Sequence, residues 1–199
     1  MGVKKPPVWR RLLIPTRITF YELHLIIQEA MPWLDYHLYE FTMPNVIATD
    51  PTYVDEDCTP QEDTVYVDAR MTMIFLPLMV FGKLDYYYDF GDGWHLKITL
   101  ENVIENSESL LPQLVAWKGT APPEDVGGTG GYEYFKEVMA DPSHEEYEEL
   151  KEWALGQFYG DPDMDEINRT FGDFFEDPGF VHTINPYQLV AEHEDLNNE

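Results

Sequence analysis

Histidine and aspartate residues are the groups in this chain best suited to metal or acid–base chemistry. His24, His37 and His95 fall on three different expected elements, a helix and two strands, and could converge near Asp89 or Asp92. Imidazole and carboxylate groups are typical ligands of divalent metals. One hypothesis is therefore a metal-assisted hydrolytic enzyme that uses these five side chains. No two histidines stand at ligand spacing within one element, so the alternative is ordinary hydrogen-bonded histidines, with no metal and no cofactor identified.

Other catalytic signatures are missing from the sequence. The lone Cys58 lies among acidic residues, which disfavour the reactive thiolate. The glycine-rich run 127–131 is not followed by the Lys-Ser/Thr pair of a phosphate-binding loop, and acidic residues flank it. We interpret it as a flexible or tightly turned connection. The sequence favours a protein that is not an enzyme, although it leaves the question open.

The charge of the chain is strongly acidic and unevenly distributed. The 199 residues carry a net charge of −26, of which −8 falls on residues 1–121 and −18 on residues 122–199. Such a surface repels a phosphate backbone, so a nucleic-acid partner is not expected, and duplex DNA should not bind at physiological salt. The first 20 residues hold five basic groups and no acid. This basic segment either pairs with the acidic half of the chain or binds an anionic ligand.

Cysteine content and hydropathy indicate the compartment. A single cysteine cannot build an internal disulfide framework, and residues 1–7 contain no apolar leader, so a cytoplasmic location is expected. The longest apolar stretch, residues 71–81, is interrupted by Thr72 and Pro77. It is shorter than the roughly 20 residues that a membrane-spanning helix needs, so no membrane association is expected.

The clearest local structure is a β-hairpin around a glycine-containing turn. Apolar residues alternate with polar ones through 84–90 and again through 94–100, and the turn between them contains Gly91 and Gly93. A tight reversal at this point requires a left-handed backbone, so at least one of these glycines should have a positive φ. Asp89 and Asp92 would then be held at the tip of the hairpin.

Further elements follow from periodicity and capping signals. Strands are predicted over 8–14, 37–43 and 114–117, and helices over 20–30, 132–140 and 143–155. Capping boxes, Thr19 with Glu22 and Ser143 with Glu146, should begin the first and third of these helices. Residues 71–81 are ambiguous between strand and helix, residues 49–64 read as an exposed loop, and signals weaken from Asp161 onward.

Two charged clusters have specific interpretations. Asp161, Asp163 and Asp165 imitate the start of a calcium-binding loop, but the required glycine and final acid are absent, so an acidic turn is expected. Neighbouring residues of a strand face opposite sides, so only one of Arg10 and Arg11 should turn inward. That arginine is expected to pair with an acid of segment 85–92 or 124–125.

Five uncommon strings occur in a fixed order along the chain. They are Pro6-Pro7-Val8-Trp9-Arg10-Arg11, Leu23-His24, Trp33 with His37-Leu38-Tyr39-Glu40-Phe41, Tyr88-Asp89-Phe90-Gly91-Asp92-Gly93-Trp94, and Pro122-Pro123-Glu124-Asp125 with the following glycines. In these strings the chain resembles the plasmid pRiA ORF-three-like family, also labelled TnpR-like transposon passengers. The resemblance covers about residues 6–171. His95 directly follows Trp94 here, whereas the family usually places a histidine one residue later.

The resemblance implies an α+β fold, with a curved, mostly antiparallel sheet, a central hairpin, and three or more flanking helices. It implies one domain over residues 1–171, followed by an acidic, partly disordered extension over 172–199. It implies no established activity. The TnpR label suggests recombination or an accessory role in a mobile element. A serine recombinase is disfavoured, because each serine of the chain has acids nearby.

We therefore expect a cytoplasmic binding or interaction module, whose partner is an unknown protein or small-molecule ligand. Its candidate site is rich in tryptophan, arginine, histidine and acids in turns, which is typical of recognition surfaces. The candidate residues are Trp9, Arg10, His24, His37, Asp89, Asp92, Trp94, Glu124 and Asp125. For each of them a purely architectural role is an equally open alternative.

Overall fold

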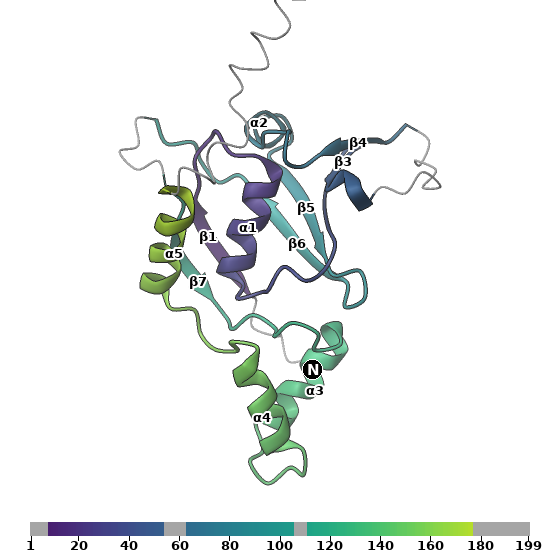
Figure 1. Ribbon diagram of the computed structural model, residues 1–199, viewed down its shortest axis with the longest axis vertical. Helices are drawn as coiled ribbons and strands as arrows, with labels where there is room; N and C mark the ends of the chain where they lie inside the picture. The colour runs from purple at the N-terminus through teal and green to yellow at the C-terminus, as the bar shows by residue number, and fades with distance from the viewer. Residues whose placement is uncertain (1–7, 54–62, 106–110, 177–199) are drawn as a thin grey trace, which may run out of the picture.

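The computed structural model describes residues 8–53, 63–105 and 111–176, and shows an α+β fold. Its main sheet has five strands in the order β4-β3-β2-β5-β6 and is not closed into a barrel (Figure 1). These strands are β2 (Tyr39–Met43), β3 (Val46–Thr49), β4 (Val65–Asp68), β5 (Lys83–Tyr88) and β6 (Trp94–Thr99). Only the β3–β4 pairing is parallel, so the expected mostly antiparallel sheet is confirmed.

The predicted central hairpin is the pair β5–β6. Tyr88 stands opposite Trp94, and the turn between them covers residues 89–93. Gly93 has a φ of +69°, as expected for a tight reversal, whereas Gly91 lies outside the positive-φ region. The inward-facing side chains Leu84, Tyr86 and Tyr88 are almost completely buried. Their alternation with the partly exposed Asp85 and Tyr87 fixes the register, because a one-residue slip would move the buried side chains to the outer face.

Helix α1 (Phe20–Ala30) lies across the sheets and provides much of the core (Figure 1). The predicted capping box is present: Thr19 accepts from the backbone of Glu22, and Glu22 accepts from the backbone of Thr19. Phe20, Leu23 and Ile27 recur along the buried face, as the helical spacing requires. This face packs on Phe41 and Tyr86 of the sheet, with ring centroids of Phe20 and Phe41 5.1 Å apart.

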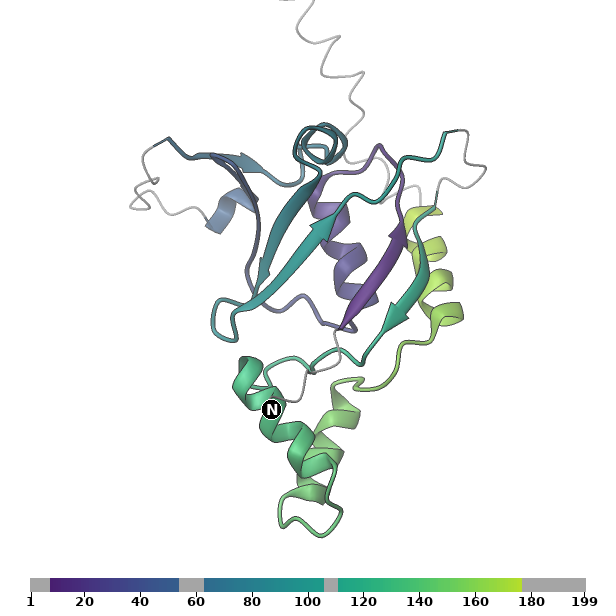
Figure 2. The same cartoon turned by 180° about the vertical axis from the view of Figure 1, so that it is seen from behind.

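Strands β1 (Trp9–Leu13) and β7 (Gln113–Lys118) form a separate antiparallel pair, seen beyond β6 in Figure 2. Arg10 is partly buried and Arg11 is exposed, so the two do face opposite sides. The predicted partners were wrong. Arg10 donates to the carbonyl oxygens of Ala30 and Gly119, and Arg11 pairs with Glu101 at 2.8 Å. Arg10 thus links β1 to the last residue of α1 and to the residue that follows β7.

The ambiguous segment 71–81 is resolved as a turn followed by helix α2 (Phe75–Phe81). Pro77 is the third residue of this helix, and the first turn has no intrahelical acceptor for its backbone N–H groups. A proline is therefore tolerated there. Gly82 ends the helix in the left-handed conformation, with a φ of +69°. The predicted exposed loop at 49–64 contains a short 3₁₀ helix, η1 (Pro51–Tyr53), and residues 54–62 lie outside the described part.

Helices α3 (Gly128–Met139) and α4 (Tyr147–Gly156) form a hairpin that projects away from the sheets (Figure 1). The second helix begins later than predicted, and its capping box is absent. The backbone N–H of Ser143 donates to Asp141 instead, and Glu146 accepts from the hydroxyl of Tyr134. Asp141 and Tyr134 thus bind the Ser143 N–H and the Glu146 carboxylate that the predicted capping box would have paired. Residues 143–146 form turns rather than the first helical turn.

Helix α5 (Met164–Glu176) follows in the region where sequence signals weakened. Asp163 accepts from the backbone N–H groups of Asp165 and Glu166, so this part of the aspartate run caps a helix. The helix packs against β7 and α1, with Phe171 in the core. It continues to Glu176, and the rest of the predicted C-terminal extension lies outside the described residues. No helix in the described segments is long and apolar enough to cross a membrane.

Candidate functional site

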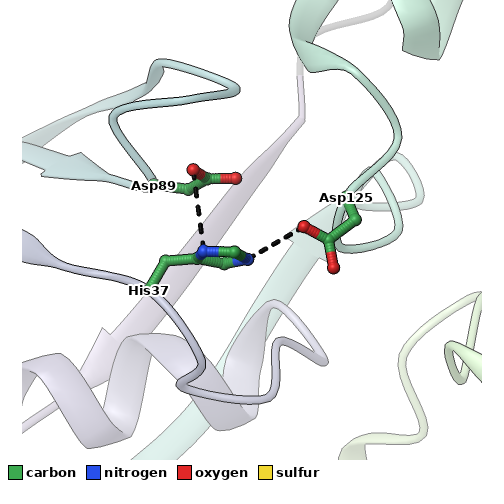
Figure 3. A group of neighbouring side chains, drawn as sticks. All are labelled: His37, Asp89 and Asp125. Carbon is green, nitrogen blue, oxygen red and sulfur yellow. Dashed lines mark ion pairs between the residues drawn. The ribbon is translucent and has the colours of Figure 1, made fainter.

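Three side chains from separate segments meet at one point beside the β5–β6 turn. They are His37, Asp89 and Asp125, each offering one ligand atom within 4.8 Å of the others (Figure 3). The His37 ring lies between the two carboxylates, with Nδ1 3.8 Å from Asp89 Oδ1 and Nε2 2.9 Å from Asp125 Oδ1. His37 precedes β2, Asp89 follows β5, and Asp125 precedes α3. The fold therefore joins segments that are far apart in the sequence.

Asp89 is held at the site by the hairpin turn. The backbone N–H of Asp89 donates to the carbonyl oxygen of Leu38 at 3.0 Å. Because Leu38 directly follows His37, this hydrogen bond holds the turn close to His37. Its φ of +52° is uncommon for a residue with a side chain, and aspartate tolerates this region better than most. One carboxylate oxygen accepts from the backbone N–H of Gly91 at 2.9 Å. The side chain is only 8% exposed, so its direction is set by the turn.

Asp125 lies in the turn that leads into α3 (residues 124–127, here called the corner). This corner is hydrogen-bonded to the β5–β6 hairpin. Asp92 accepts from the backbone N–H of Gly127 at 3.1 Å. A Cβ added to Gly128, which has a φ of +66°, would lie 2.5 Å from the carbonyl oxygen of Asp92. Only glycine permits this close approach of the corner to the turn. Asp125 itself has a φ of +56°, so both aspartates of the cluster occupy the left-handed region.

Glu124 is the buried acid directly beneath the cluster. It is 2% exposed and accepts from the hydroxyl of Tyr88 and the backbone N–H of Leu34. Burial and the Glu124 carboxylate together raise the pKa of Tyr88, so the phenol remains a donor at neutral pH. Glu124 Oε1 lies 3.9 Å from His37 Nε2. Its carboxylate adds negative charge to the site and is itself fixed by two donors.

The electrostatic environment of the cluster favours a cation. Two aspartates and Glu124 surround one imidazole, and within the described segments no ion pair joins these acids to a lysine or arginine. Asp125 is 57% exposed and His37 is 29% exposed, so the cluster is open to solvent on one side. The side chains of Tyr36 and Phe90, sequence neighbours of His37 and Asp89, are 72% and 56% exposed.

The other two histidines of the metal hypothesis are engaged elsewhere. His24 is completely buried, with Nδ1 2.8 Å from the Tyr86 hydroxyl and Nε2 2.7 Å from Asp35 Oδ1. His95 lies at the surface, where Nε2 is 2.7 Å from Asp85. Within the described segments, the predicted convergence of three histidines is therefore replaced by one histidine with two aspartates.

The remaining candidate residues have structural partners. Trp94 is 9% exposed and packs on Trp33, whereas Trp9 is 37% exposed and lies beneath the Arg11 guanidinium. Arg10 bonds to carbonyl oxygens away from the cluster, and Asp92 caps the backbone of Gly127. Of the nine candidates, His37, Asp89, Glu124 and Asp125 are brought together.

Sequence reasoning did not single out two residues that support the site. Tyr88 donates to Glu124 and accepts from the backbone N–H of Tyr36 at 3.2 Å. Leu34 contributes only its backbone, which no side-chain pattern can reveal. Tyr88 had a signal, because a tyrosine in a buried strand position needs a partner for its hydroxyl.

Comparisons with known proteins place these residues in a recognised group of sequences. A family model described as "Plasmid pRiA4b ORF-3-like protein" matches residues 1–169. Uncharacterized protein y4hQ of Sinorhizobium fredii is 37% identical over 173 residues, which cover 85% of this chain and 86% of that protein. The crystal structure of a protein of unknown function, MM3350 from Methanosarcina mazei Go1, is similar with a TM-score of 0.62 and 32% identity. The similarity covers 80% of this chain and 88% of that one.

Proposed function

This chain belongs to the plasmid pRiA4b ORF-3-like protein family, and from that premise we propose that it is a binding module built around a divalent metal ion. The ligands of the ion are His37, Asp89 and Asp125. Each ligand lies in, or directly at, one of the strings through which the sequence resembles the family. The converging strings thus support one shared site rather than three unrelated turns.

One observation carries the proposal. His37 Nε2 is buried and makes no hydrogen bond, although Asp125 Oδ1 is only 2.9 Å away. The oxygen therefore lies off the line along which a ring N–H would donate. If an ion were bound by this nitrogen and this oxygen at about 2.1 Å each, with a right angle between the two bonds, the two atoms would lie about 3 Å apart. The oxygen would then lie away from the N–H direction, as it does here. An ion at Nε2 would satisfy both atoms.

The ligand set indicates the kind of ion. One imidazole nitrogen with two carboxylate oxygens suits Zn²⁺ or Mn²⁺ better than Mg²⁺, which prefers oxygen ligands and retains its waters. The 4.8 Å spread of the three ligand atoms is wider than a filled site allows. Asp125 Oδ1 already lies 2.9 Å from His37 Nε2, so binding would mainly require Asp89 to move toward the ion.

Three protein ligands leave coordination positions open on the solvent side. An ion with open positions can bind an oxygen donor of a partner, such as a carboxylate or phosphate, which the acidic protein alone would repel. Tyr36 and Phe90, the sequence neighbours of His37 and Asp89, have exposed rings that offer apolar contact area to a partner. Hydrolysis by His24, His37 and His95 with Asp89 and Asp92 is less well supported, because His24 and His95 have other partners. We also propose that the protein acts in the cytoplasm.

Titration calorimetry with Zn²⁺, Mn²⁺ and Mg²⁺ on metal-free protein tests the proposal. We expect one equivalent of Zn²⁺ or Mn²⁺ to bind at least about tenfold more tightly than Mg²⁺. Asp125→Asn and His37→Ala should each weaken binding by about tenfold or more. His95→Ala is the matched control, because it removes another histidine–aspartate pair of similar length at the surface. Equal losses in the control and the site variants would contradict the proposed site.

A further inference from the structure

A groove of about 330 Å³ lies between α1 and α5. Its lining does not include His37, Asp89 or Asp125, the three residues of the cation cluster. Leu25, Ile26, Trp33 and three phenylalanines, Phe171, Phe174 and Phe175, supply most of its lining. The volume is at the lower end of the roughly 300–1,000 Å³ that small-ligand pockets occupy. The groove is partly open to solvent, and it suits a small molecule with an apolar body.

Two carboxylates stand among these apolar side chains. Glu29 of α1 and Asp35, which follows it in the next loop, both line the groove. Burial raises the pKa of Glu29, the nearby Thr170 hydroxyl opposes the rise, and the negative charge of Glu166 adds to it. Among the described residues, no ion pair joins Glu29 to a lysine or arginine, and the ion-pair partner of Asp35 is His24. Within the described segments, these two acids of the groove lining therefore have no lysine or arginine partner.

We infer that this groove binds a small organic cation, an ammonium group carried on an aromatic or alkyl body. The ammonium would lie against Glu29 and Asp35, and the body would lie against the phenylalanines of α5. Aromatic rings also attract cations through their faces, so the phenylalanine rings of the lining can contribute to binding the ammonium.

Charge selects this class of ligand over others of the same size. A carboxylate or phosphate ligand would meet two acids in the groove and a net charge of −26 on the whole chain. A neutral ligand would leave the partly buried Glu29 carboxylate without a counter-charge. An ammonium ligand forms charge-assisted hydrogen bonds with the acids and still buries its apolar part.

Titration of the full chain with three probes tests this inference: phenethylamine, phenethyl alcohol and phenylacetate. They share an aromatic body and differ in charge. We expect phenethylamine to bind at least about tenfold more tightly than the alcohol, and phenylacetate to show no binding. Equal affinity for the amine and the alcohol, or no binding of the amine at millimolar concentration, would overturn the inference.

Two variants locate the binding. Glu29→Gln should weaken the amine about tenfold and leave the alcohol unchanged, whereas Phe174→Ala should weaken both. Glu40→Gln is the matched control, because Glu40 is also partly buried, has a raised pKa from burial and bonds to a threonine. Phe174 is 50% exposed, so its removal should not unfold the protein. An equal effect of Glu29→Gln and Glu40→Gln on the amine would contradict the location.

The outcome can be separated from that of the cation site. Glu29→Gln should leave Zn²⁺ and Mn²⁺ affinity unchanged, since Glu29 is not among the ligands. Nuclear magnetic resonance perturbations on the amine should map to α1 and α5. A change of oligomeric state on addition of the amine, or perturbations confined to residues outside the groove lining, would overturn the inference.

Discussion

His24 and His37 both contact aspartates, and yet their surroundings differ in a way that separates structure from function. The Tyr86 hydroxyl accepts from Gln28 and lies 2.8 Å from His24 Nδ1, and His24 Nε2 lies 2.7 Å from Asp35 Oδ1. Each nitrogen of His24 therefore has an aligned partner, and the ring stacks on Tyr39 with centroids 3.7 Å apart. His37 has nearby carboxylates but no aligned hydrogen bond at Nε2. A satisfied histidine stabilises the fold, whereas an unsatisfied one among acids is available to a ligand.

The largest expected effect is that of removing His24. His24→Ala leaves a cavity in the core and deprives Tyr86 and Asp35 of their partner, so the free energy of unfolding should fall by about 3–5 kcal/mol. Urea denaturation followed by circular dichroism measures this. His95→Ala, which removes an exposed ring, should change stability by less than about 0.5 kcal/mol. A small effect of His24→Ala on the free energy of unfolding would contradict the structural role that distinguishes His24 from His37.

The second effect belongs to His37 and depends on the ion. At an ion concentration of 100 times Kd, Zn²⁺ or Mn²⁺ should stabilise the protein by about 2.7 kcal/mol. His37→Ala should abolish this increment and change the stability of the metal-free protein by less than about 1 kcal/mol. Denaturation with the ion and with a chelator separates the two contributions. A variant that keeps the increment would show that the ion binds elsewhere.

The third effect tests the close contact between the hairpin turn that carries Asp89 and the corner that carries Asp125. The Cβ of Gly128→Ala would collide with the Asp92 carbonyl and push the corner away from the hairpin, so stability should fall by about 1–3 kcal/mol. Ion affinity should fall as well, because Asp125 moves with the corner. Gly82→Ala is the control: it has a similar positive φ of +69° but open space around its Cβ. That control should lose stability through backbone strain and keep full ion affinity.

The smallest effect is expected for Asp92→Asn. Asn retains an oxygen that can accept from Gly127, so melting temperature and ion affinity should both change little, within about 0.5 kcal/mol. Asp92→Ala removes the acceptor and should cost about 1 kcal/mol. A large loss of ion affinity in Asp92→Asn, with unchanged stability, would place Asp92 among the ligands.

Elements with strong local signals could be predicted from the sequence. The hairpin with Gly93 and the capping box at Thr19 follow from alternation and turn chemistry, which depend on near neighbours. The late start of α4 could not be predicted, because Tyr134 on another helix takes the Glu146 carboxylate. The ligand set of His37 with Asp89 and Asp125 depends on how three distant segments pack. Residue types alone suggested His24 and His95 equally well, and only burial and partners distinguish them.

Segment 33–37 lies between the groove and the cation cluster, and it contacts both. Trp33, Leu34 and Asp35 line the groove, Leu34 donates to Glu124, and His37 belongs to the cluster. Any shift of this segment that an amine causes therefore changes the free energy of the ion site. Thermodynamic reciprocity then requires the ion to change amine affinity by the same factor. Through this short loop the proposed ion and amine sites would form one linked equilibrium, whose coupling can be measured by titrating either ligand in the presence of the other.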